Sequence, residues 1–243
     1  MSASYDTIGL NYSDLRKPDS RIGRLIGQAL GSAKTVLNVG AGTGSYEPAD
    51  RQVTAIEPSV KMIRQRPASA AAVIQRHAED LPFDDKSFDA SMAILTVHHW
   101  ADKEKGLREM RRVTRGQIVI LTYDPSFRGF WLADYIPELV ALDEGQMPRM
   151  TDYEQWLGPV RILPVPIPHD CTDGFLSAYW RRPAAYLDPR VRAAMSSFWA
   201  VGDVSERLGR LETDLESGAW MQRYSLLADL EQCDCGYRLV TTS

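Results

Sequence analysis

A glycine-rich turn follows a short apolar run near the start of the chain. The sequence VLNVGAGTGS places glycines at positions 40, 42 and 44 directly after a predicted buried strand. Glycine permits positive φ angles and lets the backbone approach a ligand that a Cβ would block. Glu57 follows at the end of the next predicted strand, where a carboxylate can accept hydrogen bonds from a ribose diol. This pattern predicts a nucleoside site.

Two ligand classes use such a turn. A dinucleotide oxidoreductase has the pattern G-x-G-x-x-G, with a third glycine that lets a helix N-terminus meet the pyrophosphate. Ser45 stands where that glycine would be, and the observed spacing is G-x-G-x-G. The spacing therefore favours a nucleoside that carries an amino acid, and an NAD(P)-dependent oxidoreductase is the alternative.

A second group of polar side chains ends the fourth predicted strand, in the sequence TVHHW. In an open parallel sheet, ligands bind beyond the carboxyl ends of the strands. His98 and His99 are therefore candidate general bases, because imidazole is the side chain that most often moves protons near neutral pH. We expect one of these two adjacent rings to point away from the site, and packing without titration is the alternative role. Trp100 is a candidate wall of the substrate site, or a core residue.

The elements that must position these residues alternate between strand and helix. Apolar runs without alternation, such as IVIL, are typical of strands covered on both faces. Repetition of strand, helix and strand implies a doubly wound parallel sheet. The predicted strands are Thr35–Val39, Gln52–Ile56, Ala72–Arg76, Phe88–Leu95 and Gln117–Thr122, and the predicted helices are Arg21–Leu30, Ser59–Arg66 and Lys103–Val113.

The second half of the chain is rich in aromatic residues and proline. It contains five of the six tryptophans, and its run Val160–Ile167 is predicted to be a strand that prolines confine to a sheet edge. A last strand is expected over Tyr237–Thr242. Helices are expected over Gly129–Leu142, Gly174–Arg181, Pro189–Val201 and Arg207–Glu231.

With these motifs, the sequence resembles the class I S-adenosylmethionine-dependent methyltransferases of the type 11 group. VLNVGAGTGSYE resembles the first motif of this family and IEPS the second, while AEDLPF followed by SFD resembles the segment that lines the adenine. The resemblance implies a Rossmann-like, mostly parallel seven-stranded sheet with a helical, aromatic-rich insertion before the last strand. It also implies methyl transfer from S-adenosyl-L-methionine, with S-adenosyl-L-homocysteine as product, to oxygen, nitrogen or carbon of a small molecule. The cofactor contacts that it implies are Tyr12, Arg16, Gly40, Ala41, Gly42, Gly44, Glu57, Pro58, Met62, Ala78, Glu79 and Leu95.

One position departs from this family pattern. His77 stands where many relatives carry an aspartate that accepts from the adenine amino group. Recognition of adenine is therefore expected to depend on the backbone near Ala78, or on Glu79 or Asp80. Arg16 is expected to pair with the methionyl carboxylate, and a surface arginine is the alternative.

The segment 124–235 is predicted to be an acceptor lid within one domain of residues 1–243, between a cofactor-binding half (1–123) and a last strand (236–243). Such inserts commonly form the acceptor pocket in the resembled family, and aromatic walls exclude water. Candidate substrate contacts are Trp131, Tyr135, Tyr179 and Arg182, and a dimer interface is the alternative use of these residues. Because Arg181 and Arg182 are adjacent, at most one is expected to face inward.

The net charge, the lack of long apolar runs and the cysteine count disfavour several classes of partner and site. The net charge is −4 and the pI about 5.6, which disfavours nucleic acid as the main partner. No apolar run approaches the length of a membrane-spanning helix, and no leader sequence is recognised, so a cytoplasmic protein is expected. We expect it to be a monomer or a homodimer. Three cysteines without zinc spacing predict reduced thiols and no metal. An RNA or protein methyltransferase and a catalytically idle cofactor-binding module remain as alternatives.

Overall fold

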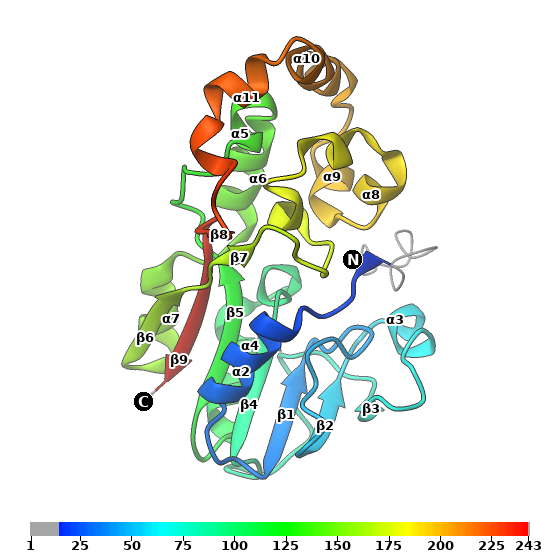
Figure 1. The fold of residues 1–243 in the computed structure, drawn as a ribbon. Coiled ribbons are helices and arrows are strands. Elements are labelled where there is room, and N and C mark those ends of the chain that lie inside the picture. The colour runs from blue at the N-terminus through cyan, green and yellow to red at the C-terminus, as the bar shows by residue number, and fades with distance from the viewer. Residues whose placement is uncertain (1–14, 243) are drawn as a thin grey trace.

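A seven-stranded sheet forms the lower part of the molecule in Figure 1. The computed structural model describes residues 15–242. The strand order is β3-β2-β1-β4-β5-β9-β6, in which the first five strands are parallel and β9 is antiparallel to both of its neighbours. The strands are β1 (Thr35–Val39), β2 (Gln52–Ile56), β3 (Ala72–Ile74), β4 (Ala90–Ile94), β5 (Ile118–Tyr123), β6 (Val160–Pro164) and β9 (Tyr237–Thr242).

Both faces of the sheet are covered, which explains the continuous apolar runs of its strands. In β5, Val119 and Leu121 belong to one core cluster, and Ile118 and Ile120 belong to the other. Helix α2 (Ser20–Ala29) packs in the first cluster and lies in front of the sheet in Figure 1. Helices α4 (Lys103–Val113) and α7 (Met150–Leu157) contribute to the second cluster. The Rossmann-like fold expected from the sequence is confirmed.

The strand order reverses between β1 and β4. At such a point the connections after neighbouring strands run to opposite sides and leave a crevice at the carboxyl edge. The glycine turn leaves β1 there, and the histidine pair follows β4 in a short 3₁₀ turn, Val97–His99. Helix α3 (Val60–Arg64) follows β2 on the same edge and is capped by Ser59, whose hydroxyl accepts from the Met62 amide.

Most of the segment between β5 and β9 forms a helical region above the sheet in Figure 1. It contains α5 (Leu132–Tyr135), α6 (Glu138–Gln146), α8 (Pro189–Ala193), α9 (Ser196–Ala200), α10 (Ser205–Glu216) and α11 (Ala219–Arg223). Three 3₁₀ turns (Leu176–Tyr179, Pro183–Leu187 and Ser225–Leu227) and a two-stranded ribbon of β7 (Ile167–Pro168) and β8 (Gln232–Cys233) complete it. Its core residues, such as Trp180 and Tyr186, continue the cluster of the α2 face.

The structure corrects several expectations for this segment. The expected helix 129–142 is two helices, with Pro137 at the start of the second. The helix expected over 207–231 ends before Gly218, whose φ of 79° is left-handed, and 189–201 is also divided. The helix expected over 174–181 is absent, and only a 3₁₀ turn, Leu176–Tyr179, forms there. The strand predicted over 160–167 ends at Pro164, at the sheet edge where its prolines were expected to place it. The segment is therefore not wholly an insertion, because β6 and α7 belong to the layers of the sheet.

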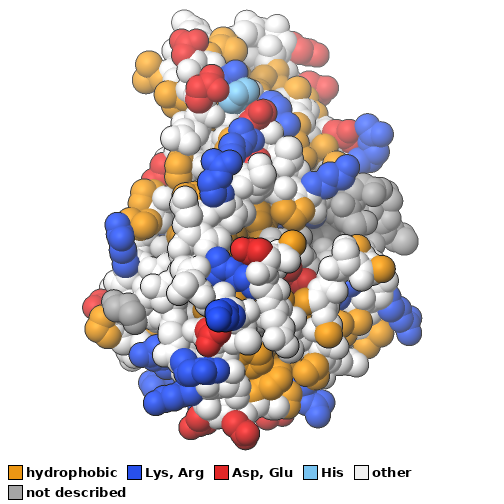
Figure 2. Space-filling view, turned by 60° about the horizontal axis from the view of Figure 1, so that its bottom comes forward, with side chains coloured by type: hydrophobic (Ala, Val, Ile, Leu, Met, Phe, Trp, Pro, Cys, Tyr) orange, Lys and Arg blue, Asp and Glu red, His pale blue; other side chains and the backbone are white. Residues whose placement is uncertain are grey.

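The described part of the chain, residues 15–242, contains no helix long and apolar enough to cross a membrane. Within the same residues, no three His, Cys, Asp or Glu side chains are grouped so that they could hold a metal ion. On the face shown in Figure 2, basic side chains lie among acidic, apolar and uncharged ones.

Candidate functional site

A cavity of about 830 Å³ opens at the carboxyl ends of β1, β2 and β4. A volume in this range suits a small molecule or cofactor. The chain turns that follow the three strands supply most of its wall, and α6 adds Gln146. The lining residues are Arg16, Asn38, Gly40, Ala41, Gly42, Thr43, Ser45, Tyr46, Glu57, Pro58, Met62, His77, Ala78, Glu79, Ile94, Leu95, Thr96, His98, His99, Trp100, Ala101, Lys103 and Gln146.

The glycine turn needs glycine at two points, at Gly40 because of close packing and positive φ, and at Gly42 because of its positive φ alone. A Cβ at Gly40, where φ is 70°, would lie 2.1 Å from the Thr96 hydroxyl oxygen. Gly42 has a φ of 52° and presents its amide toward the next strand. The amides of Gly40 and Ala41 both donate to the carbonyl of Ile56, at 2.9 Å each. The turn is thereby attached to the end of β2, and its backbone lines the cavity.

Glu57 is fixed by backbone amides. Its Oε2 accepts from the Gly42 amide at 2.7 Å and its Oε1 from the Ser59 amide at 2.9 Å. The residue is 6% exposed, and burial raises its pKa above the usual glutamate value while these two amides oppose the shift. Each carboxylate oxygen carries more than one lone pair, so Glu57 can still accept bonds from a ligand in the cavity.

A buried ion pair supports the turn from outside the cavity. Arg66 Nη2 lies 2.7 Å from Glu47 Oε1, and the Arg66 Nη1 donates to the Gly42 carbonyl. The Glu47 carboxylate also accepts from the Asn38 side chain and the Ala71 amide. Gly44 faces this support instead of the cavity, because its added Cβ would meet Ala70, Glu47 and Arg66. Gly44, expected as a cofactor contact, does not line the cavity, whereas Ser45 does.

The segment after β3 forms another part of the wall. His77, Ala78 and Glu79 line the cavity, while Asp80, considered as an adenine contact, does not. Glu79 Oε1 accepts from the Asp102 amide at 3.0 Å, which fixes this carboxylate beside the start of α4. Trp100 is 8% exposed and packs over Gly106 of α4, where an added Cβ would lie 2.6 Å from the indole.

His98 and His99 lie side by side in the wall. Their ring centroids are 3.8 Å apart, and both residues line the cavity, so the expectation that one points away is wrong. Burial, followed by the charges of neighbouring groups including Lys103 and Arg16, lowers the pKa of His98 well below the usual histidine value. The same causes lower the pKa of His99 to about 4. Both imidazoles are neutral at physiological pH, and their low pKa values make them weak bases.

Arg16 closes the cavity on the side of the N-terminal segment. Its Nε donates to Asp173 Oδ1 at 2.6 Å, and Asp173 Oδ2 accepts from the Tyr46 hydroxyl at 2.9 Å. This cluster joins the chain before α2, the glycine turn and the loop before the 3₁₀ turn Leu176–Tyr179. The expected cofactor contact at Tyr12 lies outside the described residues.

A smaller cavity of about 60 Å³ adjoins the first, and Arg16, Leu95 and His98 line both. The remaining wall comes from the end of β5, the end of α6, the start of α9 and β9. Its residues are Tyr123, Asp143, Met147, Phe175, Leu176, Met195, Ser196, Ser197 and Tyr237. Leu95, which turns the chain out of β4, has a φ of 53°, a conformation that costs a non-glycine residue about 1–2 kcal/mol.

The aromatic residues expected to face the acceptor lie elsewhere. Trp131 is 4% exposed and donates through Nε1 to the Trp180 carbonyl, and Tyr135 is 2% exposed and donates to Asp214. Neither lines the two cavities, because the helical region needs both as its core.

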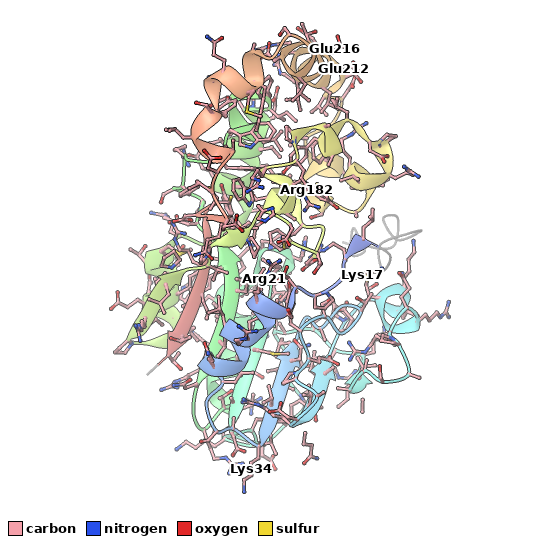
Figure 3. The ribbon with its side chains drawn as sticks, viewed as in Figure 1. Lys17, Arg21, Lys34, Arg182, Glu212 and Glu216 are labelled. Atoms are coloured by element: carbon pink, nitrogen blue, oxygen red, sulfur yellow. The ribbon has the colours of Figure 1, made fainter. Side chains whose placement is uncertain are left out.

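The expected contacts at Tyr179 and Arg182 are also absent from both cavity walls. The Arg182 guanidinium donates to the carbonyls of Cys171 and Ala178 and lies 4.6 Å from the centre of the Tyr179 ring. The Arg181 guanidinium donates to the Leu230 carbonyl, so both arginines stabilise loops through hydrogen bonds to backbone carbonyls. Figure 3 shows Arg182 in the segment above Arg21 of α2.

The sequence predictions missed the residues of the smaller cavity. Asp143 is the most informative of them, because it is 7% exposed on a helix whose acidic neighbour Glu144 is exposed. The sequence carried little signal of this burial, because α6 has no distinct apolar face and only Leu139, four residues earlier, is buried with Asp143. The aromatic residues Tyr123 and Tyr237 gave no such signal, as each ends or begins an ordinary buried strand.

Comparison with known proteins agrees with this geometry. Residues 37–120 match the family model described as a methyltransferase domain. The crystal structure of a protein described as a methyltransferase from an antibiotic biosynthesis pathway of Anabaena variabilis superposes with a TM-score of 0.86. It is 35% identical, over 94% of this chain and 99% of that one. The chain therefore belongs to the class I S-adenosylmethionine-dependent methyltransferases, and S-adenosylmethionine is the cofactor of this family.

Curated relatives match a shorter region. A rice 2-methyl-6-phytyl-1,4-hydroquinone methyltransferase is 28% identical over 131 residues, which is 50% of this chain and 38% of that protein. A Geobacter ubiquinone/menaquinone biosynthesis C-methyltransferase is 33% identical over 111 residues, 39% of this chain and 47% of that protein. The chain thus spans less than half the length of these two relatives.

Proposed function

We propose that the protein transfers the methyl group of S-adenosylmethionine to a small molecule, with the larger cavity as the cofactor site. The observation that carries this proposal is the meeting of the glycine turn, Glu57 and the segment 77–79 around one cavity of about 830 Å³. When bound, the cofactor supplies a methyl group on a positively charged sulfur. The named hydroquinone and quinone relatives support a small-molecule acceptor.

The cavity residues fit such a cofactor in three places. The backbone of the glycine turn lines the cavity where no Cβ intervenes, and Glu57 offers acceptor lone pairs for a ribose diol. Ala78 and Glu79 supply the wall for the base, and Pro58, Met62 and Leu95 supply apolar contacts. Arg16 offers a guanidinium to a methionyl carboxylate, although it shares its Nε with Asp173.

The histidine pair has a positioning role in this proposal. Methyl transfer requires the nucleophile, the methyl carbon and the sulfur in line. Neutral His98 and His99 add no positive charge beside a sulfonium, and their rings, tilted by 47° and in contact, form the wall near Leu95. The role of either ring as the general base stays a prediction, and the low pKa values weigh against it.

Binding and turnover test the proposal separately. Calorimetry is expected to show binding of S-adenosylhomocysteine and little binding of NADH. Glu57→Ala should weaken the binding of S-adenosylhomocysteine by about 1.5–3 kcal/mol, because the substitution removes charge-assisted hydrogen bonds. The exposed Glu104 gives a matched control, Glu104→Ala, which should bind normally.

Tighter binding of NADH than of S-adenosylhomocysteine would overturn the cofactor assignment. Incubation with methyl-labelled cofactor and a library of small acceptors then tests turnover. Cofactor binding without any transfer would favour the idle binding module, and transfer to RNA or protein alone would favour a macromolecular acceptor.

A further inference from the structure

The smaller cavity contains a buried carboxylate without a basic partner. Asp143 is 7% exposed, and the described residues 15–242 include no arginine, lysine or histidine at ion-pair distance from it. The Gln146 side chain shares a hydrogen bond with Asp143. The charge of Arg128 acts on Asp143 from a distance, and the Arg128 guanidinium is paired with Glu144. A buried charge without a partner is costly, so its presence in a cavity calls for an explanation.

The other walls of this cavity suit a positive charge. Tyr123 and Tyr237 meet edge to face with ring centroids 5.5 Å apart, and the centroid of Phe175 lies 4.7 Å from that of Tyr237. Aromatic faces attract cations, and the thioethers of Met147 and Met195 add polarizable contacts. The positive charge of Arg16 is compensated by Asp173 at 2.6 Å, and His98 is neutral.

The position of the cavity connects it with the proposed methyl transfer. The two cavities meet at Arg16, Leu95 and His98, which line both, while Gln146 of α6 lines the larger cavity and Asp143 of the same helix the smaller one. Asp143 also lines a third cavity of about 10 Å³. A volume of about 60 Å³ corresponds to roughly two water molecules, so it admits the reactive end of an acceptor and not a second large ligand.

We propose that Asp143 binds the acceptor as a small primary or secondary amine in its ammonium form and accepts the proton that the nitrogen must lose. This inference rests on the proposed function. The N–H bond breaks and the proton moves to the Asp143 carboxylate, which leaves a lone pair on nitrogen. That pair forms a bond to the methyl carbon while the carbon–sulfur bond breaks and its electrons stay on sulfur. The products are an N-methylammonium ion and neutral S-adenosylhomocysteine.

The acidity of Asp143 is consistent with this role. Burial raises its pKa to about 6, against the weaker opposing effects of Gln146 and Arg128. The carboxylate is then ionised near neutral pH and basic enough to hold a proton during turnover. His99, with a pKa of about 4, is a much weaker base.

A matched set of probes tests the charge preference. With saturating S-adenosylhomocysteine, we would measure binding of 2-phenylethylamine, 2-phenylethanol and phenylacetate by calorimetry. The amine is expected to bind at least tenfold more tightly than either of the others. In Asp143→Asn, which has nearly the same shape, this preference should fall to about twofold or less. In Glu144→Gln, which neutralises the exposed neighbour, the preference should remain.

The outcomes separate this inference from the proposed function. Normal binding of S-adenosylhomocysteine by Asp143→Asn shows that the variant is folded. If the wild type binds S-adenosylhomocysteine but prefers the alcohol or the carboxylate, or if Asp143→Asn keeps the amine preference, the inference is wrong and the cofactor assignment stands. Failure of the wild type to bind S-adenosylhomocysteine would overturn the proposed function and this inference with it.

Discussion

The titratable side chains around the two cavities are shifted by burial in opposite directions. Burial disfavours the charged form of any group, so it raises the pKa of a carboxyl and lowers that of an imidazole. Asp143 thus has a pKa of about 6 and His99 one of about 4, and both shifts lower the stability of the folded protein under part of the pH range. Stability measurements can therefore detect the site without any ligand.

The first residue-scale prediction concerns Asp143→Asn. A carboxyl whose pKa is raised from 3.8 to about 6 destabilises the folded state above pH 6, by about 3 kcal/mol at 1.4 kcal/mol per pKa unit. The variant should be more stable than the wild type by that amount near pH 8 and by about half as much at pH 5. Urea unfolding at both pH values measures this. An equal or lower stability of the variant at both values would show that Asp143 is not strained by burial.

The second prediction concerns His99→Gln. A histidine whose folded pKa is lowered to about 4 contributes stability above its unfolded pKa of 6.5, and this contribution is lost as the pH falls toward 4. His99 should account for a loss of about 2 kcal/mol between pH 7.5 and pH 5. His99→Gln should remove that part of the pH dependence, whereas His169→Gln, on a loop outside the cavity, should keep it. Identical pH profiles for His99→Gln and the wild type would contradict the shift.

At the scale of elements, the sequence was informative where one local pattern decides the structure. The helix predicted over Lys103–Val113 has those bounds in the structure, because Asp102 caps its first turn and its apolar residues repeat with helical spacing. The helix predicted over 129–142 failed because Pro137 interrupts it and tertiary packing of short helices overrides periodicity.

The two cavities differ in how far sequence could predict them. The larger one is built from contiguous motifs, so the positions of Gly40 and Glu57 in its wall followed from spacing along the chain, and that of Ala78 from the family resemblance. The smaller one combines Tyr123, Asp143 and Tyr237 from three distant elements, and only the folded chain brings them together. Aromatic content alone could not separate the core residues of the helical region from those of a cavity.

The element-scale prediction concerns the ion pair behind the glycine turn. Arg66 and Glu47 have side chains that are 4% and 8% exposed, whereas Arg108 and Glu104, at the same 2.7 Å separation, are 58% and 46% exposed. Removal of one partner from a buried pair leaves an uncompensated charge. Arg66→Met should cost about 3–5 kcal/mol of unfolding free energy and weaken cofactor binding, and Arg108→Met less than about 1 kcal/mol. Similar losses in chemical denaturation would show that burial does not distinguish the pairs.

At the scale of the whole molecule, one hydrophobic cluster extends from the α2 face of the sheet into the helical region. The cluster of Arg16, Tyr46 and Asp173 joins the same two parts by polar contacts. We propose on this basis that the chain folds as one domain. Tryptophan fluorescence, which reports mainly the helical region, and far-ultraviolet circular dichroism should give coincident thermal transitions. Two separate transitions would show that the helical region unfolds independently.

The shared wall of Arg16, Leu95 and His98 has a kinetic consequence. Turnover removes a positive charge from the larger cavity, since a sulfonium becomes a neutral thioether. A cationic acceptor in the adjoining smaller cavity is repelled by the substrate form of the cofactor and not by the product form. We therefore expect a dead-end complex of amine and S-adenosylhomocysteine, seen as inhibition of the steady-state rate at high amine concentration. This inhibition should weaken as salt or pH rises, because screening or loss of the ammonium proton removes the attraction to Asp143.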